Sequence, residues 1–359
     1  MALSAYRALQ PLLRAVSPEM AHGIAIRALK SGLVHGRREP DDPILASSVW
    51  GIEFSNPVGL AAGFDKNAEV MEPMLALGFG FVEAGTVTPR PQPGNPKPRL
   101  FRLDEDGAVI NRLGFNSQGL GPVVERLKQW RAGGHGGIVG ANVGKNRDTE
   151  DAAADYVAGI EAVCGLADYL VCNVSSPNTP GLRALQAREP ITQLLHRVIE
   201  ARGRCVHGAK RPPPLLAKVG PDLDDDELRD ISEVAIACGV DGLIVGNTTI
   251  TRPAGLRSRY AGEAGGLSGK PLLERSASCL ARVYELSGGR LPIIGCGGIA
   301  SGTDAYARIR AGASLVQLYS ALVFHGPALV SAIKRELAGQ LRADGFRSIA
   351  EAVGADHRL

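Results

Sequence analysis

CNVSSPNTPGLR, residues 172–183, completes an apolar run that begins at Tyr169 and opens a polar turn. Hydroxyl and amide side chains crowd its first half, and Pro177, Pro180 and Gly181 shape its second half. A buried strand that delivers polar groups at its carboxyl end is how barrel enzymes place their chemistry. An ordinary loop between a strand and a helix is also rich in serine, asparagine and proline. The segment alone therefore leaves both interpretations open.

Apolar runs of strand length recur along the whole chain and favour the barrel. Between most of them lie amphipathic segments, at 122–130, 191–202, 225–238 and 271–286. Continuous apolar strands separated by helical patterns predict a parallel sheet that is covered on both faces. Eight such units predict an α/β fold of the (β/α)8 type, and a doubly wound open sheet is the main alternative. The number of runs and the absence of GxGxxG after the first run favour the barrel. The runs are 58–62, 80–84, 138–142, 169–174, 215–219, 242–245, 292–295 and 315–319.

Length and composition indicate one large domain, which we place at residues 41–359. The chain has 359 residues, of which 45% are hydrophobic and 21% charged, so disorder is not expected. No run reaches the roughly 18 apolar residues that a membrane-spanning helix needs. Arg7 and Arg14 interrupt the first apolar stretch, which argues against a signal peptide. The six cysteines form no CxxC motif and have no histidine at metal spacing, which predicts free thiols in a reducing cytosol and no metal site.

Residues 1–40 form a separate extension with two expected helices, at 4–16 and 18–33. Ser17 and Pro18 suit the N-cap and first position of the second helix. Residues 1–38 carry a net charge of +5 while the whole chain carries +3, so the remainder is near −2. A basic amphipathic helix pair is typical of an anionic membrane surface. A helical cap with a solvated basic face is the alternative, and composition alone favours it.

Glycine-rich turns gather where a barrel binds phosphate. The loops that follow the seventh and eighth strands commonly form that site. Here GCGGIASGTD (295–304) follows the seventh run, Tyr319 and Ser320 follow the eighth, and GEAGGLSG (262–269) adds a further expected loop. These turns predict a phosphate site, and both FMN and a phosphorylated sugar would fit it.

Long motifs then match one family in order across almost the whole chain. The motifs are GLAAGFDKN, GFVEAGTVTPRPQPGNPKPRLFRL, VINRLGFNSQG, ANVGKN, CNVSSPNTPGLR, LLAKVGPD, GNTT, GGLSGKPL, GCGGI and LVQLYSAL. On these motifs the chain resembles the dihydroorotate dehydrogenases, specifically their membrane-associated, quinone-reducing class. The basic extension resembles that class's quinone-access domain, which reverses the preference for a cap.

The resemblance implies oxidation of (S)-dihydroorotate to orotate in pyrimidine (UMP) biosynthesis, with hydride transfer to FMN and electron transfer to a membrane quinone. It implies a peripheral protein on the cytoplasmic side of the cell membrane. Ser176 would be the catalytic base, with Thr179 and Phe115 in its relay and lid, and Arg102 and His22 would meet the quinone. The implied substrate residues are Lys66, Asn111, Arg112, Leu113, Gly114, Phe115, Asn173, Asn178, Asn247 and Thr248. The implied FMN residues are Ala62, Gly63, Phe64, Asp65, Lys66, Thr86, Asn142, Asn173, Lys218, Gly269, Gly298, Tyr319 and Ser320.

One departure from the family pattern is visible, and other functions remain alternatives. The family usually has a hydroxyl residue directly before Asn-Thr-Thr, where this chain has Gly246. Another FMN barrel, such as a tRNA dihydrouridine reductase, would need a basic RNA-binding surface, and the near-neutral barrel argues against nucleic acid. A phosphosugar lyase or isomerase would be colourless when purified. A non-catalytic membrane scaffold would need none of the polar strand ends.

Overall fold

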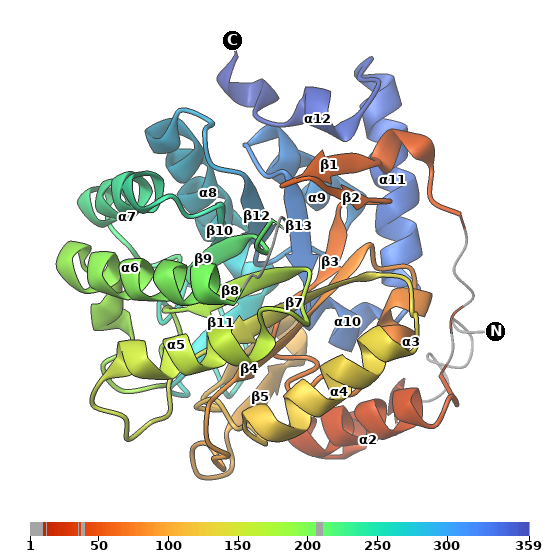
Figure 1. Ribbon diagram of the computed structural model, residues 1–359. Coiled ribbons are helices and arrows are strands. Elements are labelled where there is room, and N and C mark those ends of the chain that lie inside the picture. The colour runs from red at the N-terminus through yellow and green to blue at the C-terminus, as the bar shows by residue number, and fades with distance from the viewer. Residues whose placement is uncertain (1–9, 12, 35, 37–39, 206–210, 359) are drawn as a thin grey trace.

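A closed barrel of eight parallel strands forms the centre of the molecule (Figure 1). The computed structural model describes residues 10–11, 13–34, 36, 40–205 and 211–358. Each of the eight predicted runs overlaps one barrel strand, so the predicted (β/α)8 fold is confirmed. In their order around the barrel, the strands are β3 (Val58–Leu60), β4 (Phe81–Val87), β7 (Ile138–Val143), β8 (Tyr169–Asn173), β9 (Leu215–Val219), β10 (Gly242–Val245), β12 (Ile293–Cys296) and β13 (Leu315–Leu318).

A short hairpin closes the amino-terminal end of the barrel. Its strands β1 (Ser47–Val49) and β2 (Ile52–Phe54) pair antiparallel. Phe54 packs edge-on against Phe81 at 5.3 Å between ring centroids, and Phe81 in turn meets Tyr169 at 6.1 Å. Both partners are the first residues of their strands, so this aromatic cluster fills the amino-terminal end. Chemistry is therefore confined to the opposite end, where the strands finish.

Helices surround the barrel and confirm the predicted alternation. The predicted helix 225–238 has the observed bounds because Asp224 and Glu227 form a capping box at its start and Gly239 ends it in a left-handed conformation. The helices are α3 (Met71–Ala76), α4 (Leu120–Ala132), α5 (Ala152–Val163), α6 (Arg188–Arg204), α7 (Asp225–Cys238), α8 (Leu273–Ser287), α9 (Gly302–Arg310), α10 (Ser320–His325), α11 (Leu329–Ala343) and α12 (Ile349–Ala352). Single 3-10 turns occur at Pro43–Leu45, Asp104–Asp106, Arg183–Gln186, Lys270–Leu272 and Ala355–His357.

A three-stranded antiparallel sheet beside the barrel mouth was not predicted. It consists of β5 (Leu100–Leu103), β6 (Ala108–Asn111) and β11 (Gly266–Gly269). The expected glycine-rich loop at 262–269 is therefore wrong over its second half. Gly266 pairs with Asn111, and a Cβ at Gly266 would collide with the Thr248 side chain. Close packing, rather than loop flexibility, accounts for this glycine.

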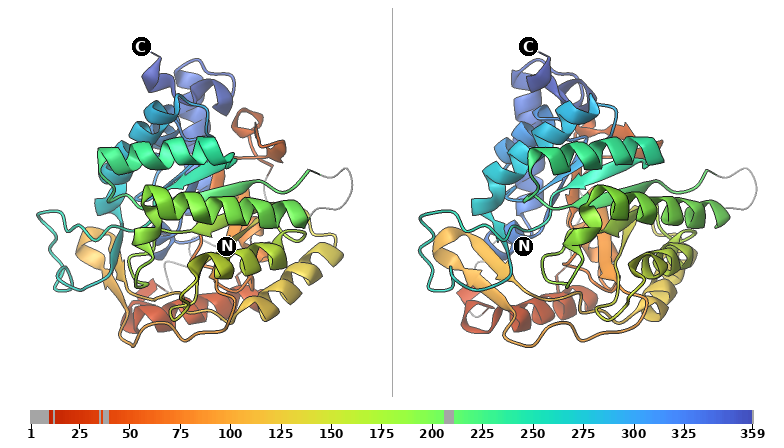
Figure 2. Two further views of the ribbon diagram at one scale, coloured as in Figure 1. Left: turned by 60° about the vertical axis from the view of Figure 1, so that its left-hand side comes forward. Right: turned by 90° about the vertical axis from the view of Figure 1, so that its left-hand side faces the viewer.

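The extension crosses the carboxyl-terminal end of the barrel, opposite the hairpin (Figures 1 and 2). Its helix α2 (Pro18–Lys30) starts where predicted, and the Ser17 side chain accepts a hydrogen bond from the Met20 amide. It ends three residues before the predicted end at Leu33. Residues 10–11 and 13–15 are also helical, while the expected start of the first helix at Ser4 lies outside the described residues. No helix in the described part of the chain is long and apolar enough to cross a membrane.

Candidate active site

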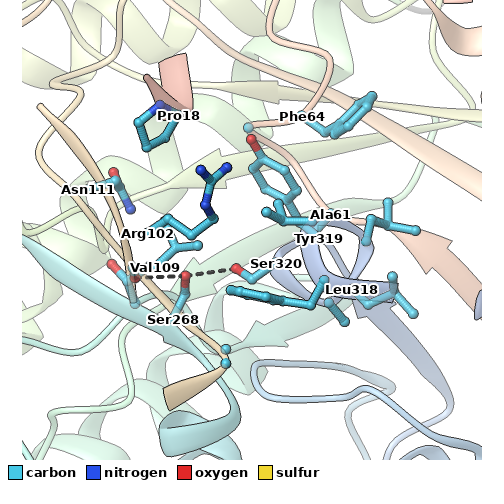
Figure 3. Close-up of a pocket in the computed structure, with 18 of the residues that line it drawn as sticks. Pro18, Ala61, Phe64, Arg102, Val109, Asn111, Ser268, Leu318, Tyr319 and Ser320 are labelled. Carbon is cyan, nitrogen blue, oxygen red and sulfur yellow. Dashed lines mark hydrogen bonds between the residues drawn. The ribbon is translucent and has the colours of Figure 1, made fainter. Parts of the chain in front are cut away.

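A cavity of about 1820 Å³ runs from the carboxyl ends of the barrel strands to the inner face of α2. Figure 3 shows part of it, with Arg102 and Asn111 on the added sheet and Tyr319 and Ser320 at the end of β13. The cavity brings most of the predicted site residues together. Those that line it are His22, Ala62, Gly63, Phe64, Lys66, Thr86, Arg102, Asn111, Leu113, Gly114, Phe115, Asn173, Ser176, Asn178, Lys218, Asn247, Thr248, Gly269, Gly298, Tyr319 and Ser320.

The polar turn after β8 is held by its own side chains. Asn173 Oδ1 accepts hydrogen bonds from the backbone N–H of Ser175 at 3.3 Å and from its hydroxyl at 3.1 Å. The Asn247 amide donates to Ser175 Oγ at 3.0 Å. Ser176 Oγ accepts a hydrogen bond from the Asn178 N–H at 3.3 Å and faces the cavity. These local bonds compete with the strand ladder, so β8 ends at Asn173 and Ser176 is aimed into the mouth.

A buried carboxylate that sequence reasoning missed sets the direction of a hydrogen-bond chain. Glu83, in the middle of β4, accepts from the Asn142 amide at 2.7 Å. Asn142 Oδ1 must then face the Thr86 hydroxyl, which donates to it at 2.6 Å. Thr86 Oγ1 is thereby left to accept from the Asn173 amide at 2.8 Å. The only available signal was an acidic residue inside an apolar run.

Lys218 presents an unpaired cation to the cavity. Its side chain is 4% exposed, and its ammonium makes no hydrogen bond or ion pair with any residue that the structure describes. A buried ammonium without a partner is costly, which indicates that a bound group supplies the partner. Gln317 Oε1, on β13, also belongs to a cavity-lining residue and is buried without a hydrogen-bond partner among the described residues. A ligand that offers both acceptors and a donor would satisfy the two side chains.

The predicted phosphate corner combines two glycines of positive φ with two hydroxyl side chains. Gly297 and Gly298 adopt φ values of 116° and 79°, which side chains other than glycine rarely adopt. The Ser268 and Ser320 hydroxyls lie 2.7 Å apart at the same end of the cavity. Gly246 also lines the cavity, and a Cβ there would meet Pro221 at an ordinary contact distance of 3.4 Å. A small side chain would therefore fit at the position where the chain departs from its family.

Ionisable groups meet where the barrel mouth reaches α2. Lys66 Nζ donates to the Gly63 carbonyl at 2.7 Å, and burial lowers the pKa of this ammonium to about 8. Burial and the neighbouring Lys66 charge lower the pKa of His22 to about 3, so His22 is neutral at physiological pH. Its Nδ1 lies 3.4 Å from the Tyr319 hydroxyl. Phe64 packs edge-on against both rings, at 5.3 Å from His22 and 5.4 Å from Tyr319.

Four predicted site residues do not line the cavity. The Arg112 guanidinium pairs with Glu263 at 2.7 Å. The Asp65 carboxylate accepts hydrogen bonds from the backbone N–H groups of Glu69 and Val70, just before α3. Asn142 stands behind Thr86. Thr179 is 5% exposed, and its hydroxyl has no hydrogen-bond partner in the described part of the chain. The first three are placed to orient neighbours, and their direct contact with a ligand stays a prediction, as does the relay role of Thr179.

Comparison with known proteins gives the site its family. The family model described as Dihydroorotate dehydrogenase matches residues 44–341. The chain belongs to the dihydroorotate dehydrogenase family. A relative named dihydroorotate dehydrogenase (quinone) from Azorhizobium caulinodans is 64% identical, covering 98% of this chain and 99% of that protein. The mitochondrial dihydroorotate dehydrogenase (quinone) of Mus musculus is 50% identical, covering 97% and 89% respectively. A crystal structure of the Eimeria tenella enzyme in complex with ferulenol superposes with a TM-score of 0.93 at 43% identity, over 97% of this chain and 99% of that one.

Proposed function

We propose that this protein oxidises dihydroorotate to orotate in pyrimidine biosynthesis, with FMN as the resident cofactor and a membrane quinone as the final acceptor. One observation carries the proposal beyond family membership. A single cavity joins Ser176 and the unpaired Lys218, at the strand ends, to the apolar inner face of α2. A polar reaction site and a lipophilic entry path would thus meet in one continuous cavity.

The polar residues fit a flat anion that is rich in N–H and C=O groups. Asparagine supplies a donor and an acceptor together, and Asn111, Asn173, Asn178 and Asn247 all line the cavity. Lys66 adds a cation for the carboxylate. Ser176 would accept the proton from C5 of dihydroorotate, and Thr179, buried three residues further on, would continue the relay. A serine hydroxyl is a weak base, so this relay is needed for the transfer.

FMN fits the residues that remain unsatisfied. Lys218 would stabilise negative charge on the ring system, Gln317 would gain a donor for its free oxygen, and Gly298 with Ser320 would hold the phosphate. When bound, FMN supplies the hydride acceptor. The chain's own contribution is to orient the cofactor, exclude water and place Ser176.

The extension would admit the quinone and attach the protein to the membrane surface. Small and apolar side chains of α2 such as Ala21, Ala25 and Ala28 line the outer part of the cavity, where Arg102 and His22 also lie. Met20, which does not line the cavity, is 54% exposed, and Leu33, a cavity-lining residue just beyond α2, is 80% exposed. The last turn of α2 carries the basic residues Arg27 and Lys30, and exposed apolar side chains on a basic helix are typical of interfacial helices. We therefore propose a peripheral protein on the cytoplasmic side.

A visible absorption spectrum followed by anaerobic addition of dihydroorotate tests the function. The purified protein should be yellow, and dihydroorotate should bleach the flavin band in a single turnover. A quinone should then restore the band. A colourless protein that holds no flavin would overturn the proposal and favour a phosphosugar barrel. A flavoprotein that dihydroorotate does not bleach would place the chain among other FMN barrels.

A further inference from the structure

The extension is fastened to the barrel by an ion pair as well as by apolar contacts. Glu19, in the first turn of α2, faces the guanidinium of Arg99. Arg99 Nη2 donates to Oε1 at 2.7 Å, and Arg99 Nε donates to Oε2 at 3.2 Å. The Arg99 side chain is 7% exposed, while that of Glu19 is 26% exposed. Forked bonds between a guanidinium and a carboxylate fix orientation as well as distance.

Arg99 also shapes the turn that precedes β5. Its Nη1 donates to the Pro93 carbonyl at 2.6 Å and to the Asn95 carbonyl at 2.8 Å. Without Glu19, the buried guanidinium would lose its only ion-pair partner among the described residues. An uncompensated buried cation shifts or draws in water, so this turn depends on the carboxylate of α2.

The turn before β5 also holds the loop that carries Ser176. The Asn95 amide donates to the Asn178 carbonyl at 3.1 Å and to the Arg112 carbonyl at 2.9 Å. Asn178 spans the candidate substrate site, since its N–H reaches Ser176 Oγ and its amide reaches Asn111 Oδ1, both at 3.3 Å. The side chains of Arg99 and Asn95 thus connect the extension helix to the loop of the candidate catalytic serine.

We infer that Glu19 is a positioning residue that couples the quinone-access extension to the dihydroorotate site through Arg99 and Asn95. The inference rests on the proposed function and deepens it. The position of α2 biases the position of the Ser176 loop, and occupancy of the substrate site biases α2 in return. The extension is then part of the first half-reaction, because it sets the geometry in which the substrate is held.

Lys97 provides a matched control. It also pairs with Glu19, at 3.4 Å, but it is 69% exposed and makes no hydrogen bond to the Ser176 loop. Lys97→Gln removes one ion pair of the same carboxylate and leaves the route through Arg99 intact. Glu19→Gln removes the charge from both pairs at nearly constant shape.

The first experiment measures orotate binding by the perturbation of the flavin spectrum in the purified holoenzyme. Glu19→Gln should raise the dissociation constant of orotate about threefold or more, within the range for contacts that carry coupling. Lys97→Gln should stay within about twofold. Hydrogen exchange of residues 174–183 should quicken in Glu19→Gln only. A Glu19→Gln protein of reduced thermal stability with unchanged orotate affinity and unchanged exchange at 174–183 would show a merely structural fastener, and the inference would be wrong.

The second experiment begins with two measurements that keep Glu19 and so do not depend on the folding of the Glu19→Gln variant. Coupling between sites is reciprocal, so orotate should slow exchange in α2 of the unaltered protein. Asn95→Ser, which breaks the link to Asn178, should abolish that slowing. In a double-mutant cycle, the variant that carries both Glu19→Gln and Asn95→Ser should raise the orotate dissociation constant by less than the product of the two single-variant increases. Independent effects would overturn the inference. Failure of the unaltered holoenzyme to bind orotate would instead overturn the proposed function.

Discussion

The Asn142 amide donates a 2.7 Å hydrogen bond to the buried carboxylate of Glu83, and this contact fixes the polarity of the cavity wall. Because the Asn142 side chain donates through its nitrogen to Glu83, its oxygen is free to accept a hydrogen bond from the Thr86 hydroxyl. Tyr169 and Gln317 also donate to Glu83, at 3.2 and 2.7 Å. One buried acid thus orients side chains on three other strands, and a single amide orientation of Asn142 satisfies all the bonds.

Glu83→Gln should therefore destabilise the protein and loosen the cofactor site. The N–H groups of a glutamine amide would face the donors of Asn142, Tyr169 or Gln317. Each buried donor left without an acceptor costs about 1–3 kcal/mol of folding stability. Tyr169→Phe removes one donor and keeps the acceptor, so its effect should be smaller. Chemical denaturation and the fraction of protein that retains flavin measure both effects. Equal losses in the two variants would show that the acceptor has no special role.

Lys218→Met should lower flavin occupancy or shift the flavin potential downward. The ammonium is buried and meets no partner in the described part of the chain, so we expect FMN to be its principal partner. Lys145 is a matched control, because it is also buried at the end of a barrel strand but donates to the Thr149 carbonyl at 2.9 Å. Lys145→Met should leave occupancy and potential unchanged. A fully flavinated Lys218→Met protein with the original potential would contradict the assignment.

Ser176→Ala should retain FMN and bind orotate, yet slow flavin reduction by about 10²-fold or more, the size of a general-base contribution. Stopped-flow bleaching by dihydroorotate measures this rate. Ser175→Ala provides the contrast, because Ser175 holds the Asn173 and Asn247 amides and should affect orotate affinity more than the rate. Bleaching of Ser176→Ala near the original rate would remove Ser176 from the role.

The barrel could be predicted because its evidence is local. Strands covered on both faces are continuous apolar runs, and a capping box such as Asp224 with Glu227 marks a helix start within four residues. The added sheet could not be predicted, since Gly266–Gly269 has the composition of a loop and becomes a strand only by pairing with β6. Glu19 and Arg99 are 80 residues apart in sequence, and no local pattern indicates their contact.

The cavity residues were predicted through family motifs, but motifs do not separate the residues that touch a ligand from those that orient them. Asp65 lies between Phe64 and Lys66 in the motif, yet it accepts two backbone N–H bonds outside the cavity. Arg112 likewise turns to Glu263. Neighbouring residues on an irregular turn point in different directions, and that direction follows from backbone geometry rather than from residue type.

Orotate affinity should fall as the pH rises through about 8. Burial lowers the pKa of Lys66 to about 8, so the ammonium that would bind the carboxylate is lost above that pH. Loss of one required proton weakens binding by up to about tenfold per pH unit. Titrations of the holoenzyme with orotate between pH 6.5 and 9.5 measure the effect. Lys66→Arg stays charged throughout this range. A decline that persists in this variant would come from another group.

Attachment to the membrane should depend on apolar side chains of the extension and on its positive charge. Met20 on α2 and Ile250 in a barrel loop are exposed to almost the same extent, 54% and 56%, and so form a matched pair. Met20→Asp should weaken binding to anionic vesicles about tenfold or more, because it removes an apolar side chain whose burial in the membrane surface would contribute about 1.5–3 kcal/mol, and it adds a charge that the surface repels. Ile250→Asp should bind as the unaltered protein does.

Met20→Asp should also affect the two half-reactions differently. Turnover with a long-chain quinone in vesicles should fall in Met20→Asp, while single-turnover bleaching by dihydroorotate should stay at the original rate, which also shows that the neighbouring Glu19 contact survives. Binding of the unaltered protein should weaken with salt, because attraction of arginine and lysine to the surface is screened within about 8 Å at physiological ionic strength. Deletion of the whole extension is a poorer test, since it also removes Glu19 from Arg99. If Met20→Asp and Ile250→Asp bind vesicles equally and salt has no effect, the exposed side of α2 is not the membrane-facing surface.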